Sequence, residues 1–288
     1  MPDVATKTRT EIVSLANDCA LEVSQGQRFE FGENWTRFLS EVDEARISLA
    51  VASLREMLEL DDLSGRRFLD IGCGSGLFSL AARRLGATVF SFDLDPQSVA
   101  CTRELKRRYA NDDDAWTITT GGVLDSAFVA SLGKHDIVYS WGVLHHTGAM
   151  WQALENALSV CKSDGLLFIA IYNDEGGATR RWTAIKRMYN AMPKAGKSLL
   201  VCAVGAYFIA KGVIAHAARF KNPIAAVTKP AGRGMSWYRD LVDWVGGYPF
   251  EAARPEQIFD FCRARGFNLM RLKTDRGYGC NEFVFRRA

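Results

Sequence analysis

The chain has 288 residues, of which 48% are hydrophobic and 24% charged, as in ordinary soluble globular proteins. This length suits one α/β domain with additional segments, and no internal repeat or low-complexity tract is visible. The seven cysteines form no C-x-x-C pair and residues 1–11 are polar, so we expect a reduced, cytoplasmic protein rather than an exported one. The net charge of +3 hides one segment, Ala178–Arg239, with twelve Lys and Arg residues and no Asp or Glu, which leaves −9 on the rest of the chain.

The first region in chain order, residues 1–63, has a mostly helical pattern. Gln27–Leu39 interrupts that pattern with aromatic residues, among them Phe31 and Trp35. These rings either pack this N-terminal arm against the rest of the protein or line a ligand pocket, and the sequence leaves both interpretations open.

A glycine-rich turn follows the arm. Arg66–Ile71 has the apolar pattern of a short strand, Leu77–Leu85 has that of a helix, and between them lie Gly72, Gly74 and Gly76. Glycine has no Cβ and tolerates positive φ, so such a turn lets the backbone approach a ligand closely. The dinucleotide fingerprint is G-x-G-x-x-G. The spacing here is G-x-G-x-G with Asp70 two residues ahead, which favours S-adenosylmethionine (SAM) over NAD.

The next strand supports a nucleoside ligand. Thr88–Asp93 is strand-like and ends in a carboxylate about 20 residues after the glycines, where doubly wound folds place the acceptor for ribose hydroxyls. Asp93 is therefore the predicted ribose ligand, and Leu94 beside it is predicted to cover one face of the adenine.

Strands and helices then alternate along the chain. The predicted strands are 66–71, 88–93, 116–120, 135–140, 165–172, 267–273 and 280–286. Helical patterns fill most gaps, for example at 96–109, 150–161 and 255–265. Alternation of this kind predicts a parallel sheet with helices on both faces. Only a few residues join the last two strands, which makes them an antiparallel hairpin.

This order of elements resembles the class I SAM-dependent methyltransferases, over roughly residues 60–173 and 255–288. The resemblance implies an α/β fold with a seven-stranded, doubly wound, mostly parallel sheet that a hairpin closes. The Rossmann-like SAM-binding domain that it implies comprises residues 64–173 and 255–288. Two regions lie outside the sheet pattern: the N-terminal helical arm (1–63) and a basic, apolar helical cap inserted between strands five and six (174–254). The cofactor that the resemblance implies is SAM.

The predicted cofactor site gathers residues at the carboxyl ends of the first four strands. It comprises Asp70, Gly72, Cys73, Gly74, Gly76, Asp93, Leu94, Asp125 and Trp141. Cys73 is expected to pack rather than react. In relatives the turn after the third strand touches the adenine, so Asp125 either accepts a hydrogen bond from the adenine amino group or caps the next helix.

The predicted catalytic residues follow strands four and five, where the methyl group is expected. His145 and His146 come after the fourth strand, and histidine can accept a proton near neutral pH. Relatives often carry Leu-His-His here; the alternative is that one histidine caps a helix and the other packs. Tyr172 emerges after the fifth strand. The predicted acceptor pocket adds Phe31, Trp35, Asn173 and Tyr278.

Two classes of site are disfavoured. No H-x-x-x-H or C-x-x-C spacing suggests a metal site, so we expect none. The Asn/Asp-Pro-Pro-Tyr tetrad of amino methyltransferases that act on DNA, RNA or protein glutamine would follow strand four, where Ser-Trp-Gly-Val stands instead. Nucleic acid is therefore not the expected substrate, despite the basic cap.

The cap contains a long apolar stretch, Leu199–Ala218, with one Lys, one His and no Asp, Glu or Arg. It is long enough to approach the roughly 20 residues of a membrane span. Three interpretations stay open: a buried cap helix, a helix lying in a membrane surface, or a true span. The basic residues in and around 194–221 suit an anionic lipid surface or a phosphorylated acceptor equally.

The predicted function is SAM-dependent methyl transfer to a small-molecule or lipid-like acceptor, which could be anionic. Oxygen on a sugar, phenol or quinol is the expected target, because the Val-Leu-His-His stretch is similar to that of ubiquinone-type and secondary-metabolite enzymes. The alternatives are an NAD-linked oxidoreductase and a non-catalytic SAM-binding protein at a membrane surface. We expect a cytoplasmic protein, with peripheral contact at the inner membrane surface if the apolar stretch meets lipid.

Overall fold

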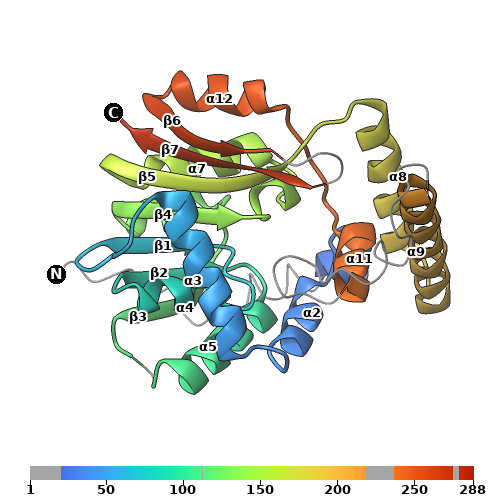
Figure 1. The fold of residues 1–288 in the computed structure, drawn as a ribbon, viewed down its shortest axis with the longest axis horizontal. Helices are drawn as coiled ribbons and strands as arrows, with labels where there is room; N and C mark the ends of the chain where they lie inside the picture. The colour runs from blue at the N-terminus through green and yellow to red at the C-terminus, as the bar shows by residue number, and fades with distance from the viewer. Residues whose placement is uncertain (1–20, 112, 218–236, 275–278) are drawn as a thin grey trace.

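The computed structural model describes the chain except residues 1–20, 112, 218–236 and 275–278. Its centre is a seven-stranded sheet in the order β3-β2-β1-β4-β5-β7-β6 (Figure 1). The strands are β1 Arg67–Ile71, β2 Thr88–Asp93, β3 Trp116–Thr120, β4 His135–Trp141, β5 Cys161–Tyr172, β6 Phe267–Lys273 and β7 Cys280–Arg287. The strands β1 to β5 pair in parallel, whereas β7 pairs antiparallel with both β5 and β6. The predicted fold class is confirmed.

Helices cover both faces of the sheet because its strands are apolar on both sides. Successive side chains of a strand point to opposite faces, so Phe68 packs with α3 and α4 while its neighbour Leu69 packs with α6, α7 and α12. The same alternation divides Phe168 from Ile169 on β5. The helices on these faces are α3 Glu44–Leu58, α4 Leu77–Arg84, α5 Pro96–Tyr109, α6 Ser126–Ser131, α7 Met150–Ser159 and α12 Pro255–Arg263.

A third apolar cluster lies beyond the carboxyl ends of the parallel strands. It joins the arm to the cap through side chains such as Phe29, Trp182, Val204 and Val245. The helices that contribute are α8 Gly177–Ala191, α9 Lys194–Ala217 and α11 Trp237–Gly246, with α2 Phe31–Phe38 beside them. Figure 1 shows these helices at the end of the sheet where β4 and β5 terminate. This position places arm and cap over the edge where ligands bind in open α/β sheets.

The arm stretch that was expected to interrupt the helical pattern contains a helix, α2. The largest difference in a strand boundary is at β5. This strand begins at Cys161 rather than at residue 165, and the preceding helix ends at Ser159. The reason is a pairing of Cys161 with His135 ahead of a register shift in the β4–β5 ladder. A β-bulge of this kind interrupts the apolar alternation from which strand starts are predicted.

Candidate active site

One cavity of about 1160 Å³ lies at the carboxyl edge of the sheet, between the strand ends, the arm and the cap. Its floor is the turn between β1 and α4. Gly72, Gly74 and Gly76 all have positive φ there, at 74°, 53° and 80°. A Cβ on Gly72 would lie 2.4 Å from Val143 Cγ1, and one on Gly74 would lie 2.9 Å from Trp35 Cε2. The turn therefore requires glycine for both conformation and space.

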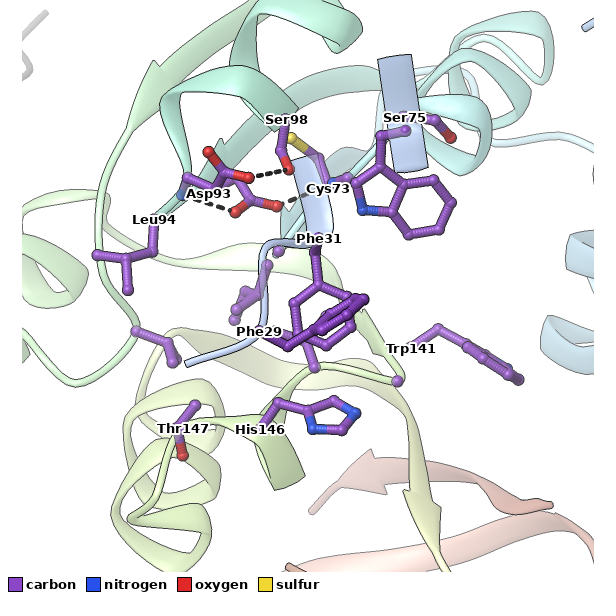
Figure 2. A pocket seen from close by; sticks show the side chains of 18 of the residues that line it. Phe29, Phe31, Cys73, Ser75, Asp93, Leu94, Ser98, Trp141, His146 and Thr147 are labelled. Carbon is purple, nitrogen blue, oxygen red and sulfur yellow. Dashed lines mark hydrogen bonds between the residues drawn. The ribbon is translucent and has the colours of Figure 1, made fainter. Parts of the chain in front are cut away.

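Asp93, at the end of β2, points into this cavity (Figure 2). Its Oδ2 accepts from the amide of Gly74 at 2.9 Å, and its Oδ1 accepts from the amide of Asp95 at 3.0 Å. Burial raises the pKa of Asp93 to about 6, against which the amide hydrogen bonds act. The carboxylate thus shapes the glycine turn and presents negative charge where ribose hydroxyls were predicted.

Asp70 lies deeper, near the end of β1, and is also part of the cavity lining. Its Oδ2 accepts from the Ser79 hydroxyl at 2.5 Å, and that hydroxyl lies 2.6 Å from the Ser91 hydroxyl. Burial, with a smaller contribution from the charge of Asp93, raises the pKa of Asp70 to about 7, against which the Ser79 hydrogen bond acts. A cation bound in the cavity would lower the pKa of both carboxyl groups, because it favours their ionised forms.

The remaining predicted cofactor residues also line the cavity. Leu94 and Trp141 lie on its wall (Figure 2). Cys73 packs beneath it, accepting from the Thr102 hydroxyl at 3.3 Å, and burial raises the pKa of its thiol well above the usual range, so it is no nucleophile. Asp125 caps α6, with Oδ1 accepting from the Phe128 amide at 2.9 Å. The capping interpretation of Asp125 is confirmed, and its adenine contact stays a prediction.

Aromatic rings from three segments form the other end of the cavity. The arm supplies Phe31 and Trp35, β5 supplies Tyr172, and the cap supplies Phe208 and Trp244. Trp35 lies against Gly74, and the Phe31 ring centre is 5.1 Å from that of His146. This end of the cavity is therefore apolar and suits a ring or a chain better than a strongly hydrated ligand.

The two histidines occupy different positions. His146 lines the cavity and is 8% exposed (Figure 2). Its Nδ1 lies 2.6 Å from the carbonyl oxygen of Pro249. His145 is fully buried behind it, outside the cavity lining, and its Nδ1 accepts from the Tyr172 amide at 3.3 Å. Burial lowers the pKa of His145 well below its usual range, so this histidine is a neutral packing residue between β5 and the cap.

One predicted acceptor residue lies outside the lining of the main cavity, and another lies outside the described residues. Asn173 is held by neighbours, because its Oδ1 accepts from Asn281 and its Nδ2 donates to Glu175, and it is absent from the lining of the main cavity. Tyr278 lies outside the described residues. Their roles stay predictions.

Sequence reasoning missed Pro249 and Arg28. The Pro249 carbonyl orients His146, and Arg28 lines the cavity while its Nη1 donates to the His146 carbonyl at 3.4 Å. No pattern could have revealed Pro249, because a main-chain carbonyl has no residue-type signal. Arg28 is one of two arginines in the aromatic stretch of the arm, so a cation among rings was a usable but unspecific signal.

A comparison with protein families decides the class of this site. A family model described as a methyltransferase domain matches residues 42–197, which is more than half of the chain. The chain belongs to the SAM-dependent methyltransferases. Its cofactor is SAM, and the glycine turn and Asp93 fit that ligand, since the turn leaves no room for a Cβ and the carboxylate faces the cavity. The NAD-linked alternative loses its support.

Curated relatives match only part of this methyltransferase. The ubiquinone biosynthesis O-methyltransferase of Brucella melitensis biotype 2 is 32% identical over 111 residues, which cover 38% of this chain and 43% of the relative. The ribosomal protein L11 methyltransferase of Methylococcus capsulatus is 42% identical over 71 residues, 24% of each chain. The chain thus matches less than half the length of these relatives.

Solved structures support the fold. The magnesium protoporphyrin IX methyltransferase of Synechocystis PCC 6803, with S-adenosylhomocysteine bound, has a TM-score of 0.51 at 16% identity and matches 98% of this chain and 99% of its own. An N-methyltransferase of Bradyrhizobium japonicum WM9 has a TM-score of 0.50 at 13% identity and matches 89% and 98%. At these identities the likeness shows the fold alone.

The glycine turn makes a testable prediction through Gly76→Ala. A Cβ there would lie 2.7 Å from Thr102 Cγ2 at a φ of 80°. Gly266→Ala is the matched control, since Gly266 has a φ of 79° and nothing within 4 Å of the added Cβ. We expect the control to cost about 1 kcal/mol of unfolding free energy and Gly76→Ala to cost more and also weaken SAM binding. Denaturant unfolding and calorimetric titration measure both; equal effects of the two variants would contradict the steric argument.

SAM affinity should depend on pH through the two carboxyl groups. The pKa is about 6 for Asp93 and about 7 for Asp70 in the ligand-free protein, and a cationic ligand favours their ionised forms. Binding therefore releases protons: the affinity rises with pH and levels off above about pH 7, with a slope of at most about tenfold per pH unit for each group. Calorimetric titrations across this range test the prediction. Asp70→Asn should flatten the plot of SAM affinity against pH near pH 7, where Asp70 titrates. A SAM affinity that falls with rising pH would contradict the prediction.

Proposed function

We propose that this protein transfers a methyl group from SAM to an oxygen of a small-molecule or lipid-like acceptor, such as a phenol, quinol or sugar. The observation that carries the proposal is the position of His146 in an apolar cavity beside the predicted cofactor site. The partial match to ubiquinone biosynthesis O-methyltransferases supports oxygen as the target atom.

The hydrogen bond of His146 defines which ring nitrogen can take a proton. A carbonyl oxygen only accepts, so the contact with Pro249 requires the hydrogen to be on Nδ1. Among the described residues, Nε2 has no hydrogen-bond partner. Burial lowers the pKa of His146 to about 3, with Lys186 adding to the effect, so the ring is neutral at physiological pH. Nε2 therefore keeps its lone pair for an acceptor hydroxyl.

Proton transfer to His146 is compatible with the charge of the cavity. When bound, SAM supplies an electrophilic methyl carbon on a cationic sulfur, and that positive charge is lost on transfer. A proton taken from the acceptor oxygen by Nε2 restores one positive charge within the same cavity. The net charge of the cavity is therefore the same before and after the reaction. Burial lowers the proton affinity of the imidazole in the free protein, and the unchanged net charge offsets that penalty during the reaction.

The aromatic walls supply orientation. Phe31 and Tyr172 flank His146, with ring centres 5.1 Å and 5.6 Å from it. Methyl transfer is an in-line displacement, so holding the acceptor oxygen in the correct place accounts for much of the rate. We infer that Phe31 and Tyr172 hold the acceptor ring while Trp35 covers the glycine turn.

We also propose that the protein is cytoplasmic, with peripheral contact at the inner membrane surface through the helical part of residues 194–221. Nucleic acid is not a proposed partner. The basic, acid-free segment Ala178–Arg239 supports attraction to an anionic lipid or an anionic acceptor.

The test uses purified protein, methyl-labelled SAM and a lysate of the source cells, followed by extraction with organic solvent. Label in the organic phase supports a lipid or quinone-like acceptor, and label in the aqueous phase supports a soluble metabolite. Tight SAM binding with no label in any acceptor would contradict the proposal and favour the non-catalytic SAM-binding alternative.

A further inference from the structure

The helix α9 is apolar on the side that faces solvent. It is the one helix in the described part of the chain that is long and apolar enough to cross a membrane, by length and composition. Only 17% of its most apolar 18-residue stretch is buried, however. A surface helix of a soluble protein ordinarily buries one apolar face and presents a polar one to water. α9 departs from that rule along most of its length.

The inward face of α9 is fixed to the protein. Val201 and Val204 are buried in the cap cluster, and Phe208 stacks on Trp182 with ring centres 5.7 Å apart and an angle of 15° between the planes. Phe208 also lines the active-site cavity. Because α8 and α11 hold this face, α9 cannot be surrounded by lipid as a single membrane span is. The geometry favours a helix that lies in the plane of a surface.

The outward face forms a continuous apolar stripe. Leu199 is 73% exposed, Tyr207 53% and Ile214 67%. The exposed residues between them at the helical spacing of three and four are the small Cys202, Ala203, Ala206 and Ala210, with the single charged residue Lys211 near the end of the stripe. Such a stripe remains costly in water, and because it extends over about four turns it is a long surface rather than a pocket for one side chain.

The charged residues of α8 and α9 are all basic. Arg180, Arg181 and Lys194 are exposed on α8 and at the start of α9, and Lys211 is exposed within α9. The segment Ala178–Arg239 contains no acidic residue. Figure 1 shows α8 and α9 next to each other at the edge of the molecule farthest from β1 and β2. Basic side chains beside an apolar helix face match the headgroups and acyl boundary of an anionic lipid surface.

We infer that the outward face of α9 docks this protein on an anionic membrane surface, in the plane of the headgroups. The helix that carries the exposed stripe also lines the acceptor end of the cavity, through Phe208. The acceptor class that follows, which rests on the proposed function, is a hydroxylated molecule held in the membrane. It reaches His146 past the cap without crossing bulk water.

The test is sedimentation of the full-length protein with vesicles of phosphatidylcholine that contain phosphatidylglycerol. The double variant Leu199→Glu/Ile214→Glu places charge on the stripe and touches neither the cavity lining nor the cap cluster. We expect its vesicle partition coefficient to fall by about tenfold or more relative to the unaltered protein. The unaltered protein should bind more weakly to vesicles of pure phosphatidylcholine, which offer the basic residues no anionic headgroups. High salt should also weaken its binding, because salt screens the attraction between the basic residues and the headgroups.

The matched control is Leu49→Glu/Met270→Glu, which alters two apolar residues that are 57% and 47% exposed on α3 and β6. This variant should sediment with vesicles as the unaltered protein does. The inference is overturned if the unaltered protein stays in the supernatant or if both double variants bind equally. It is also overturned if sedimentation velocity shows that the stripe is covered by a second copy of the chain, with only the α9 variant monomeric.

The proposed function is tested separately by the same variants. Leu199→Glu/Ile214→Glu should keep SAM affinity and methyl transfer to a detergent-dispersed extract while losing vesicle binding. Vesicle binding without any methylated product would contradict the proposed function and leave the docking surface intact.

Discussion

His146→Asn should lower kcat by about two to four orders of magnitude while the affinity for SAM stays unchanged. The asparagine amide can still donate to the Pro249 carbonyl in place of Nδ1, so the local fold is retained, but no group remains to accept the proton of the acceptor hydroxyl. Single-turnover kinetics with labelled SAM and the acceptor found in the lysate measure kcat, and calorimetric titration measures SAM affinity.

The matched control for this prediction is His135→Asn. His135 is also a buried histidine, 1% exposed, but it lies at the start of β4, at the opposite end of the strand from the cavity. It should leave kcat near that of the unaltered protein, even if the free energy of unfolding falls. A His146→Asn enzyme with full kcat would show that the acceptor is already ionised or that another group takes the proton.

Asp93→Ala should weaken SAM binding by about one hundredfold or more. The carboxylate is predicted to accept from the ribose hydroxyls, and charge-assisted hydrogen bonds are worth about 1.5–3 kcal/mol each. Its loss also releases the amides of Gly74 and Asp95, which shape the cofactor turn. Isothermal titration of SAM into the variant measures the effect.

Asp43→Ala separates this binding effect from a general loss of stability. Asp43 caps α3 by accepting from the Arg46 amide at 2.8 Å, and it is not part of the cavity lining. Its removal should cost about 1 kcal/mol of unfolding free energy and leave SAM affinity unchanged. An Asp93→Ala protein that binds SAM as tightly as the unaltered one would remove Asp93 from the ribose site.

Much of the fold and the cofactor site could be predicted because local patterns encode them. Gly72, Gly74 and Gly76 mark the turn whatever surrounds them, since only glycine combines positive φ with the lack of a Cβ. The alternation of strands and helices fixes a parallel sheet, whose carboxyl ends bring Asp70, Asp93 and the glycine turn to one edge. The start of β5 was wrong by a few residues because a register shift interrupts the alternation.

The acceptor end could not be predicted to the same depth. Two adjacent histidines look equivalent in the sequence, but His145 is buried behind the cavity and His146 faces it. Their difference comes from Pro249, which lies 103 positions after His146 and approaches only when the cap folds back. Similarly, the sequence shows that α9 is apolar, but not which residues are covered by α8 and α11.

The sequence by itself determined the sheet, the cofactor turn and the segregation of charge, because these depend on residues that are close along the chain or on regular spacing. The tertiary structure decided the roles of the two histidines, the walls of the acceptor cavity and the exposed stripe of α9. Those features depend on contacts between different segments of the chain, such as His146 with Pro249 or α9 with α8 and α11. There burial and hydrogen bonding, and not residue type, set the pKa and the accessibility of each group.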